Sequence, residues 1–431
     1  MAQGDVVWIL GAGFSKPLGG PLLADLFAPN SVQTMRDRFK KNLYRSPNVE
    51  DTPERLALVA AVWLYNYGIC FKNGPVPGFD LDSRPRGERL WDDAEEFLDV
   101  LDLAADSLKE KQFPGDDDFK ENSLARHLRT FLGNRSVRGA NPPDWWEETN
   151  KNPTMLLGRV NREARRLMAA QCSAFMLNAD EATERWSPFV QWARSLDKKH
   201  TVVTFNYDCA TEKAAGDKVQ VVTDEAVAAP GEKPRLFKVH GSTDWIRVQN
   251  TPSCQITRQY GQWACLDHTL EAHICIGTPG INKREVADYL KPIWEGALKA
   301  IREAEAVIFV GYRFPPSDSD AREKILGAIQ GNNSPHLLLH TVLGPEINDP
   351  STSRLRGLLS SRMADRSRLS RCDPDDGEQT FADDHKRQGM TPPGGKVGRG
   401  RRYGIVSHPL YSQDFVSAPG RLFHPHYRAD W

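Results

Sequence analysis

An asparagine and a histidine follow two separate apolar runs of the chain, and both side chains could take part in chemistry at neutral pH. Asn206 lies in Thr204–Asp208 (TFNYD), and His240 lies in Val239–Ser242 (VHGS). An imidazole titrates near neutrality, so His240 is suited to general acid–base work. The structural alternatives are an asparagine that forms a turn, an Asp208 that caps a helix, and a histidine that only packs.

The start of the chain has the pattern of a phosphate-binding turn. The β-branched run Val6–Leu10 precedes Gly11-Ala12-Gly13-Phe14-Ser15, and apolar residues then follow at helical spacing, which predicts a strand, a glycine turn and a helix. The glycines would let the backbone approach a pyrophosphate, and the first helical turn would direct its amides to the anion. Lys16 stands where GxGxxG has its third glycine, so a tight turn without a ligand is the alternative.

A fourth polar segment, GYRFPPSD, follows the apolar run Ala306–Val310. Gly311 would allow the backbone to come close to a ribose or a phosphate, with Tyr312 beside it. Asp318 either joins this site or caps the helix that the sequence predicts next.

The elements that must position these residues are predicted by near-continuous apolar runs separated by helical patterns. Such runs are typical of strands buried on both faces, as in a parallel sheet covered by helices. The fold class is therefore predicted to be α/β, a doubly wound, mainly parallel Rossmann-like sheet whose carboxyl edge carries the ligand site. The strands are expected at 6–10, 201–205, 235–239, 272–276, 306–310 and 336–342.

The chain divides by composition into three parts. Residues 1–35 and 186–361 are expected to form the nucleotide-binding core. Residues 36–185 lack strong strand signals and predict a helical insertion over the carboxyl edge, with amphipathic helices near 89–111, 122–132 and 155–178. Residues 362–431 are rich in charge, glycine and proline, and predict a polar, loosely ordered tail.

Charge and cysteine content limit the classes of function. Lys and Arg number 56 against 57 Asp and Glu, a net charge of −1, so no global field indicates direct nucleic-acid or membrane binding. No apolar run of about 18 residues or signal-type start is present, so a cytoplasmic protein is expected. The seven cysteines form no Cys-x-x-Cys pair, and the looser group Cys254, Cys265, Cys275, His268 and His273 lacks zinc-ligand spacing, so no metal is expected.

Taken in order, GAGFS, TFNYD, HGS and GYxFPxSD resemble the strand ends of the sirtuin superfamily. The resemblance is to the bacterial sirtuin-like branch that hydrolyses NAD in anti-phage defence, and it covers roughly residues 1–345. Residues 92–101 (DDAEEFLDVL) also look like the acidic helix common in that branch.

The resemblance implies a role for each matched residue. The turn from Gly11 to Ser15 would hold the NAD diphosphate and the adjoining ribose. Asn206 would order a water and the nicotinamide ribose, Asp208 would support the nicotinamide pocket, and His240 would deprotonate a ribose hydroxyl or water. The remaining residues expected to contact NAD are Ala12, Phe14, Gly241, Ser242, Gly311, Tyr312 and Asp318.

Two departures from protein-deacylating sirtuins bear on the reaction. Their four-cysteine zinc ribbon has no counterpart in the cysteine spacing here, and their PDFR stretch is replaced by Pro21-Leu22-Leu23-Ala24-Asp25. Both departures concern the acyl-lysine apparatus. The resemblance therefore implies an NAD glycohydrolase that forms nicotinamide and ADP-ribose without a metal, acting as an abortive-infection effector. The alternatives are an NAD-dependent deacylase and a non-catalytic module that senses NAD or ADP-ribose.

The resemblance also carries an expectation about assembly. An enzyme that destroys NAD must be restrained, so a homo-oligomer is expected, with a separately encoded sensor or an ATPase- or Argonaute-type partner.

Overall fold

The computed structural model describes residues 5–27, 61–62, 64–66, 93–109, 153–176, 183–223, 231–248, 272–277, 283–315, 318–346, 350–363, 367–368 and 402–417. Among these residues, no helix is long and apolar enough to cross a membrane.

The centre of the fold is an eight-stranded sheet in which every strand pair among the described residues is parallel. Its strand order is β3-β4-β2-β1-β7-β8-β10-β9. Strand β1 lies between β2 and β7, in register at Trp8 with Val202 and Ile308. The α/β, Rossmann-like prediction is confirmed. The strands are β1 Val6–Leu10, β2 His200–Thr204, β3 Gln220–Val222, β4 Arg235–Lys238, β7 Ala306–Val310, β8 His336–Gly344, β9 Ser367–Arg368 and β10 Arg402–Pro409.

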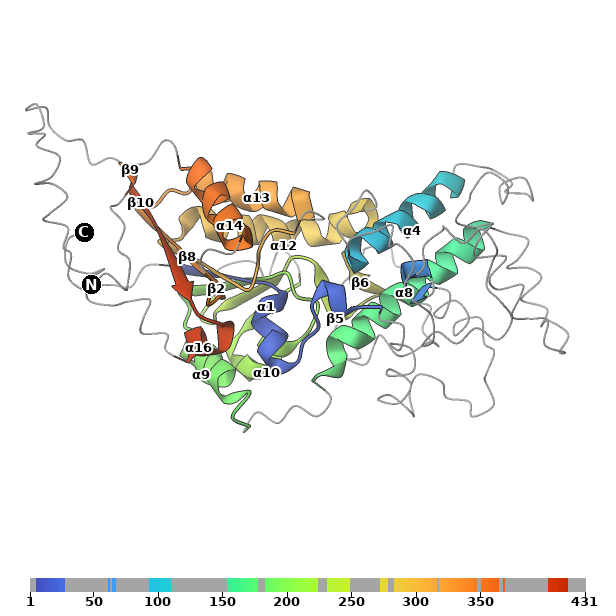
Figure 1. Ribbon diagram of the computed structural model, residues 1–431, viewed down its shortest axis with the longest axis horizontal. Helices are drawn as coiled ribbons and strands as arrows, with labels where there is room; N and C mark the ends of the chain where they lie inside the picture. The colour runs from blue at the N-terminus through green and yellow to red at the C-terminus, as the bar shows by residue number, and fades with distance from the viewer. Residues whose placement is uncertain are drawn as a thin grey trace, which may run out of the picture.

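Helices cover both faces of this sheet (Figure 1). Helices α12 (Lys283–Glu303), α13 (Ser319–Gln330) and α14 (Pro350–Ser361) lie on one face. Helices α9 (Ser187–Ser195), α10 (Ala210–Ala215) and α16 (Ser412–Val416) lie on the other. Each face has its own hydrophobic core. Because side chains alternate along a strand, Val7 and Ile9 pack in the core on the side of α12, α13 and α14, while Trp8 packs in the core on the side of α9, α10 and α16. Burial on both faces explains the near-continuous apolar runs.

One predicted strand belongs elsewhere. Residues 272–276 were expected in the parallel sheet, but β6 (Ala272–Ile276) pairs antiparallel with β5 (Gly241–Val248) in a separate two-stranded sheet. A short apolar run fits either arrangement, because periodicity alone does not distinguish them.

Two described helices of the predicted insertion, α4 (Ala94–Lys109) and α8 (Pro153–Ala174), pack against each other beside β5 and β6 (Figure 1). Arg165 of α8 bonds Asp102 of α4 through Nη2 and Oδ2 at 2.6 Å, and its Nη1 donates to the Ile276 carbonyl at 3.0 Å. The helix expected at 122–132 lies outside the described residues.

Four short helical turns complete the described elements. Helix α1 (Ala12–Ser15) follows β1 directly, and three 3₁₀ turns span Lys16–Leu18, Leu23–Asp25 and Gly216–Lys218.

The tail differs from its prediction over residues 402–416. Strand β10 pairs with β8 along its length, and Phe415 of α16 is fully buried against Trp8, with ring centroids 6.3 Å apart. A loosely ordered tail is therefore wrong for this stretch, because its few apolar residues complete the sheet and one of its cores. Residues 369–401 and 418–431 lie outside the described residues. The proposed domain boundaries stay predictions.

Candidate functional site

The polar segments predicted from the sequence meet at one edge of the sheet. Strands β4, β2, β1 and β7 are consecutive and parallel, so their carboxyl ends lie on the same side. The chain runs from β1 toward β4 and β3, and later returns to the opposite side of β1 at β7. Such a reversal of strand order marks the ligand crevice in open α/β sheets.

The glycine turn packs against the segment after β7. The amides of Gly11 and Gly13 donate to the carbonyls of Val310 and Gly311, at 3.0 and 3.1 Å. A Cβ on Gly13 would lie 2.7 Å from the Gly311 Cα, and Gly311 itself has φ +66°. These glycines therefore allow the turn after β1 and the segment after β7 to pack against each other. This is a structural role in addition to the predicted approach of the backbone to a phosphate. The ring of Phe14 lies in the core against Trp192, so only its backbone is left for a ligand.

Lys16 and Asp25, which depart from the family patterns, lie together at the surface. Their Nζ and Oδ2 atoms are 2.7 Å apart, and the Lys16 ammonium holds the pKa of the Asp25 carboxyl below its usual range. Both side chains are about half exposed.

Ser15 joins the glycine turn to the end of β2. The Asn206 amide nitrogen donates to the Ser15 hydroxyl at 3.3 Å, and that hydroxyl also bonds the Asp208 carboxyl. Asp208 additionally accepts the Ala210 amide at 2.9 Å, but Cys209 is the N-cap residue of α10, so Asp208 is not the helix cap that the alternative expected. Burial raises the pKa of Asp208, while Lys238 and these hydrogen bonds act in the opposite direction. Ser15, Asn206 and Asp208 are thus brought together, and all three are buried.

His240 is paired with Asp318 from the segment after β7. Its Nε2 lies 3.2 Å from Asp318 Oδ1, and both side chains are buried. Tyr312 donates its hydroxyl to Asp318 Oδ2 at 2.6 Å, and burial together with the Asp318 charge raises the Tyr312 pKa. Asp318 stands at the start of α13, but its carboxylate is directed to Tyr312 and His240 instead of the amides of that helix. A carboxylate at this distance stabilises the protonated form of an imidazole by its charge.

Aromatic rings enclose His240. Phe205 stacks on Tyr312, with centroids 3.9 Å apart, and meets the His240 ring edge-on at 4.9 Å. Tyr207 lies 6.0 Å from the imidazole at an interplanar angle of 27°, and Trp294 lies at 6.4 Å. These rings exclude water from most of the histidine surface and limit its movement.

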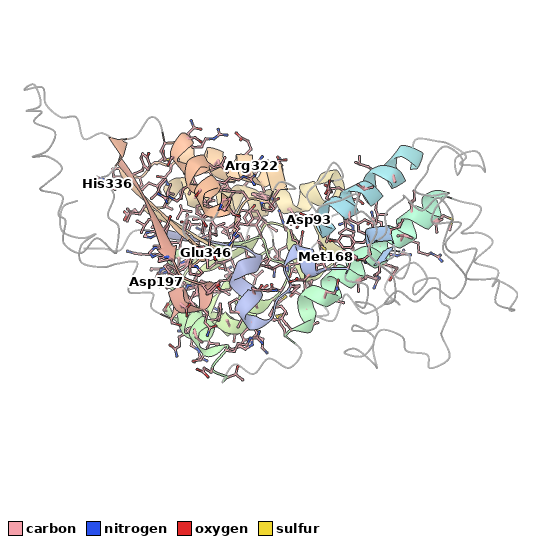
Figure 2. All side chains as sticks on the ribbon, in the orientation of Figure 1. Asp93, Met168, Asp197, Arg322, His336 and Glu346 are labelled. Carbon is pink, nitrogen blue, oxygen red and sulfur yellow. The ribbon has the colours of Figure 1, made fainter. Side chains whose placement is uncertain are left out.

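Sequence reasoning missed Glu95, which α4 brings to this site. Its Oε1 accepts the Tyr207 hydroxyl at 2.7 Å, and its side chain is buried. Burial and the Asp318 charge raise the pKa of Glu95 to about 7, against the opposing effects of His240 and Tyr207. Asp93 fixes the start of α4 by accepting the amides of Glu95 and Glu96, and Figure 2 labels it at that end of the helix. The only sequence signal is the acidic stretch 92–101.

Gly241 is required by the backbone conformation, and Ser242 belongs to a second cluster of polar residues. Gly241 has φ +79°, and a Cβ there would lie 1.9 Å from the Cys275 carbonyl oxygen. The Ser242 hydroxyl donates to Asp244 Oδ1 at 2.5 Å, away from the His240–Asp318 pair. Direct contacts of these two residues with NAD stay predictions.

The second cluster surrounds Lys238 at the end of β4. Lys238 Nζ bonds Glu212 Oε1 at 2.9 Å and donates to the Asp208 carbonyl, and its side chain is fully buried. Burial lowers the pKa of Lys238, but neighbouring acidic groups outweigh it and the net shift is upward. Within the described residues, Cys209, Glu212 and Asp244 are grouped closely enough to hold a metal ion, but the lysine ammonium already supplies a cation to the group.

The metal group considered from the sequence is tested only in part. Cys254, Cys265 and His268 lie outside the described residues. Cys275 is buried and forms no disulfide within the described residues.

Fold and site together define a class of protein, an α/β domain with a Rossmann-like sheet and a buried histidine–carboxylate pair at the carboxyl edge of its strands. Residues 200–358 match the family model of the SIR2-like domain, which confirms the predicted resemblance over that part of the chain. The match includes Asn206, His240 and Asp318, whereas the glycine turn lies before it. A search among curated proteins found no match. The family links the chain to NAD in general.

Proposed function

We propose that this protein is an NAD glycohydrolase, which converts NAD and water into nicotinamide, ADP-ribose and a proton. The observation that carries the proposal is the His240–Asp318 pair, 3.2 Å apart and buried at the same sheet edge as the Ser15–Asn206 contact. The pair supplies a base beside a carboxylate that stabilises its protonated form, and Asn206 supplies an amide for a water or a ribose hydroxyl.

The proposed reaction requires little covalent chemistry from the protein. Nicotinamide leaves through an oxocarbenium-like state, so the site must orient a weak nucleophile and stabilise positive charge. In the proposed mechanism His240 accepts the proton of the attacking water or of a ribose hydroxyl. Asp318 stabilises the imidazolium formed, as a buried carboxylate does next to a catalytic histidine. The proton is then released to solvent with the products.

The biological setting follows from the resemblance to the defence branch. We propose an abortive-infection effector that is restrained at rest, works as a homo-oligomer and responds to a separately encoded sensor or ATPase- or Argonaute-type partner. Low basal turnover by the isolated protein, with a rise on assembly, is the expected behaviour. The chemistry proposed requires no metal.

Product analysis tests this proposal against its alternatives. Purified protein is incubated with NAD over a range of protein concentrations, alone and with the products of neighbouring genes, and the products are separated. Equal amounts of nicotinamide and ADP-ribose without any peptide are expected. Nicotinamide release that requires an acyl-lysine peptide would indicate a deacylase, and binding of NAD without turnover under every condition would indicate a sensing module.

A further inference from the structure

Glu95 connects the helical insertion to the His240 site by a buried path of contacts. From α4 its carboxylate accepts the Tyr207 hydroxyl at 2.7 Å. The Tyr207 ring lies beside the His240 ring at 6.0 Å, and His240 in turn contacts Asp318. Tyr207 itself belongs to the segment that carries Asn206. One side chain of the insertion thus reaches both parts of the proposed catalytic machinery.

The group formed by Glu95, His240 and Asp318 is electrically neutral only if its members share a proton. Glu95 and Asp318 are both buried, and His240 contacts Asp318 and lies beside Tyr207, the hydrogen-bond partner of Glu95. Two ionised carboxylates beside one imidazolium would leave a net negative charge in a buried site, which is costly. Electrostatic interactions couple Glu95 to both Asp318 and His240, and burial raises its pKa to about 7.

We propose that Glu95 is a positioning residue of the His240 site, supplied by the insertion, which holds the Tyr207 ring against the imidazole and shares a proton with the His240–Asp318 pair. Its effect on NAD turnover rests on the proposed function, whereas its coupling to His240 does not. Docking of the insertion therefore influences the pH at which His240 loses its proton.

The groups facing Glu95 determine the direction of the coupling. They are Asp318, His240, Tyr207 and the helix-capping Asp93. Cys172 of α8 acts on Tyr207 from a further element. Above about pH 7 Glu95 is ionised, and a negative charge beside an imidazole favours its protonated form. Because the interaction is mutual, removing the Glu95 charge makes His240 easier to deprotonate.

The experiment is an NMR titration of the full chain labelled with ¹³C-histidine, with the His240 signal assigned by its loss in His240→Gln. In Glu95→Gln the His240 titration should move to lower pH by about half a unit or more relative to wild type. Glu95→Asp keeps an ionisable group and should restore part of the shift. Glu96→Gln removes the same charge from the next, partly exposed position of α4 and should leave the titration unchanged.

The rate of NAD turnover gives a second readout. A base must be deprotonated, so turnover should rise with pH through the His240 titration. In Glu95→Gln this acidic limb should move to lower pH by the same amount as the NMR signal, with KM unchanged. A purely structural Glu95 would lower the rate without moving the limb, and that result would overturn the proposal. So would a His240 titration identical in wild type and Glu95→Gln.

The two proposals fail in different ways. A shifted His240 titration in a protein that never turns over NAD would support the coupling and refute the proposed hydrolysis. NAD hydrolysis together with an unshifted His240 titration would support the proposed hydrolysis and refute the coupling.

Discussion

Replacement of Phe415 by alanine tests whether the C-terminal segment belongs to the folded core. Helix α16 has five residues, too few to be stable alone, so tertiary packing must hold it. Phe415 is fully buried, with its ring 6.3 Å from Trp8 and 4.8 Å from His408. Truncating a buried phenylalanine to alanine costs about 3–5 kcal/mol in unfolding free energy.

The assay is thermal unfolding followed by circular dichroism. At roughly 2–4 °C per kcal/mol, the expected loss for Phe415→Ala is at least about 6 °C. Tyr411→Ala is the matched control, because Tyr411 precedes α16 but is exposed, and its melting temperature should stay near wild type. A Phe415→Ala protein that melts within about 1 °C of wild type would show that α16 adds nothing to the folded core and that this segment is loosely ordered.

Phe415→Ala should also affect the glycine turn of the candidate site. Ser412 of α16 donates its hydroxyl to the carbonyls of Gly13 and Phe14, at 3.1 and 3.2 Å. Loosening α16 therefore removes a support of the glycine turn.

Two further predictions concern the backbone and pH. In a urea titration, Gly241→Ala should lower the unfolding free energy by more than about 1 kcal/mol, because φ is +79° and the Cys275 carbonyl occupies the space of a Cβ. Gly158 lies in helix α8 with open space around its Cα, so Gly158→Ala should be neutral or stabilising in the same titration. Burial, followed by the His408 charge, lowers the pKa of His340 to about 3, so the unfolded chain binds more protons between about pH 3 and 6.5. Stability should therefore be complete above about pH 6.5 and fall with acidification, by about 2 kcal/mol at pH 5. In His340→Gln, urea midpoints at pH 5 and 7.5 should differ less than in wild type, and an equal difference would contradict the assignment.

The sequence predicts the strands of the sheet where burial makes them continuously apolar. Val6–Leu10 and Ala306–Val310 are buried along their whole length, so their composition carries the signal. Strand β10 was not predicted, because Arg402–Pro409 mixes polar and apolar residues inside a stretch dominated by charge and glycine. Its pairing with the distant strands β8 and β9 makes it a strand.

The site was predictable where short motifs end strands, and less so where distant residues supply partners. Asn206 and His240 are found from their place after apolar runs. Asp318 could equally be a helix cap, and only the fold brings it to His240. Glu95 looks like an ordinary acidic residue in the first turn of a helix, which is common and stabilising at the surface. Its burial depends on how α4 packs, which no local pattern contains.

Nicotinamide release by His240→Ala tests whether His240 takes part in NAD hydrolysis. The matched control is His200→Ala, since His200 is also buried and contacts Asp197 at 2.8 Å, but lies at the amino end of β2 on the opposite edge of the sheet. Under conditions in which wild type is active, His240→Ala should lose about 10²-fold or more of its nicotinamide release while remaining folded, and His200→Ala should keep it. Near-wild-type release by folded His240→Ala would contradict the account.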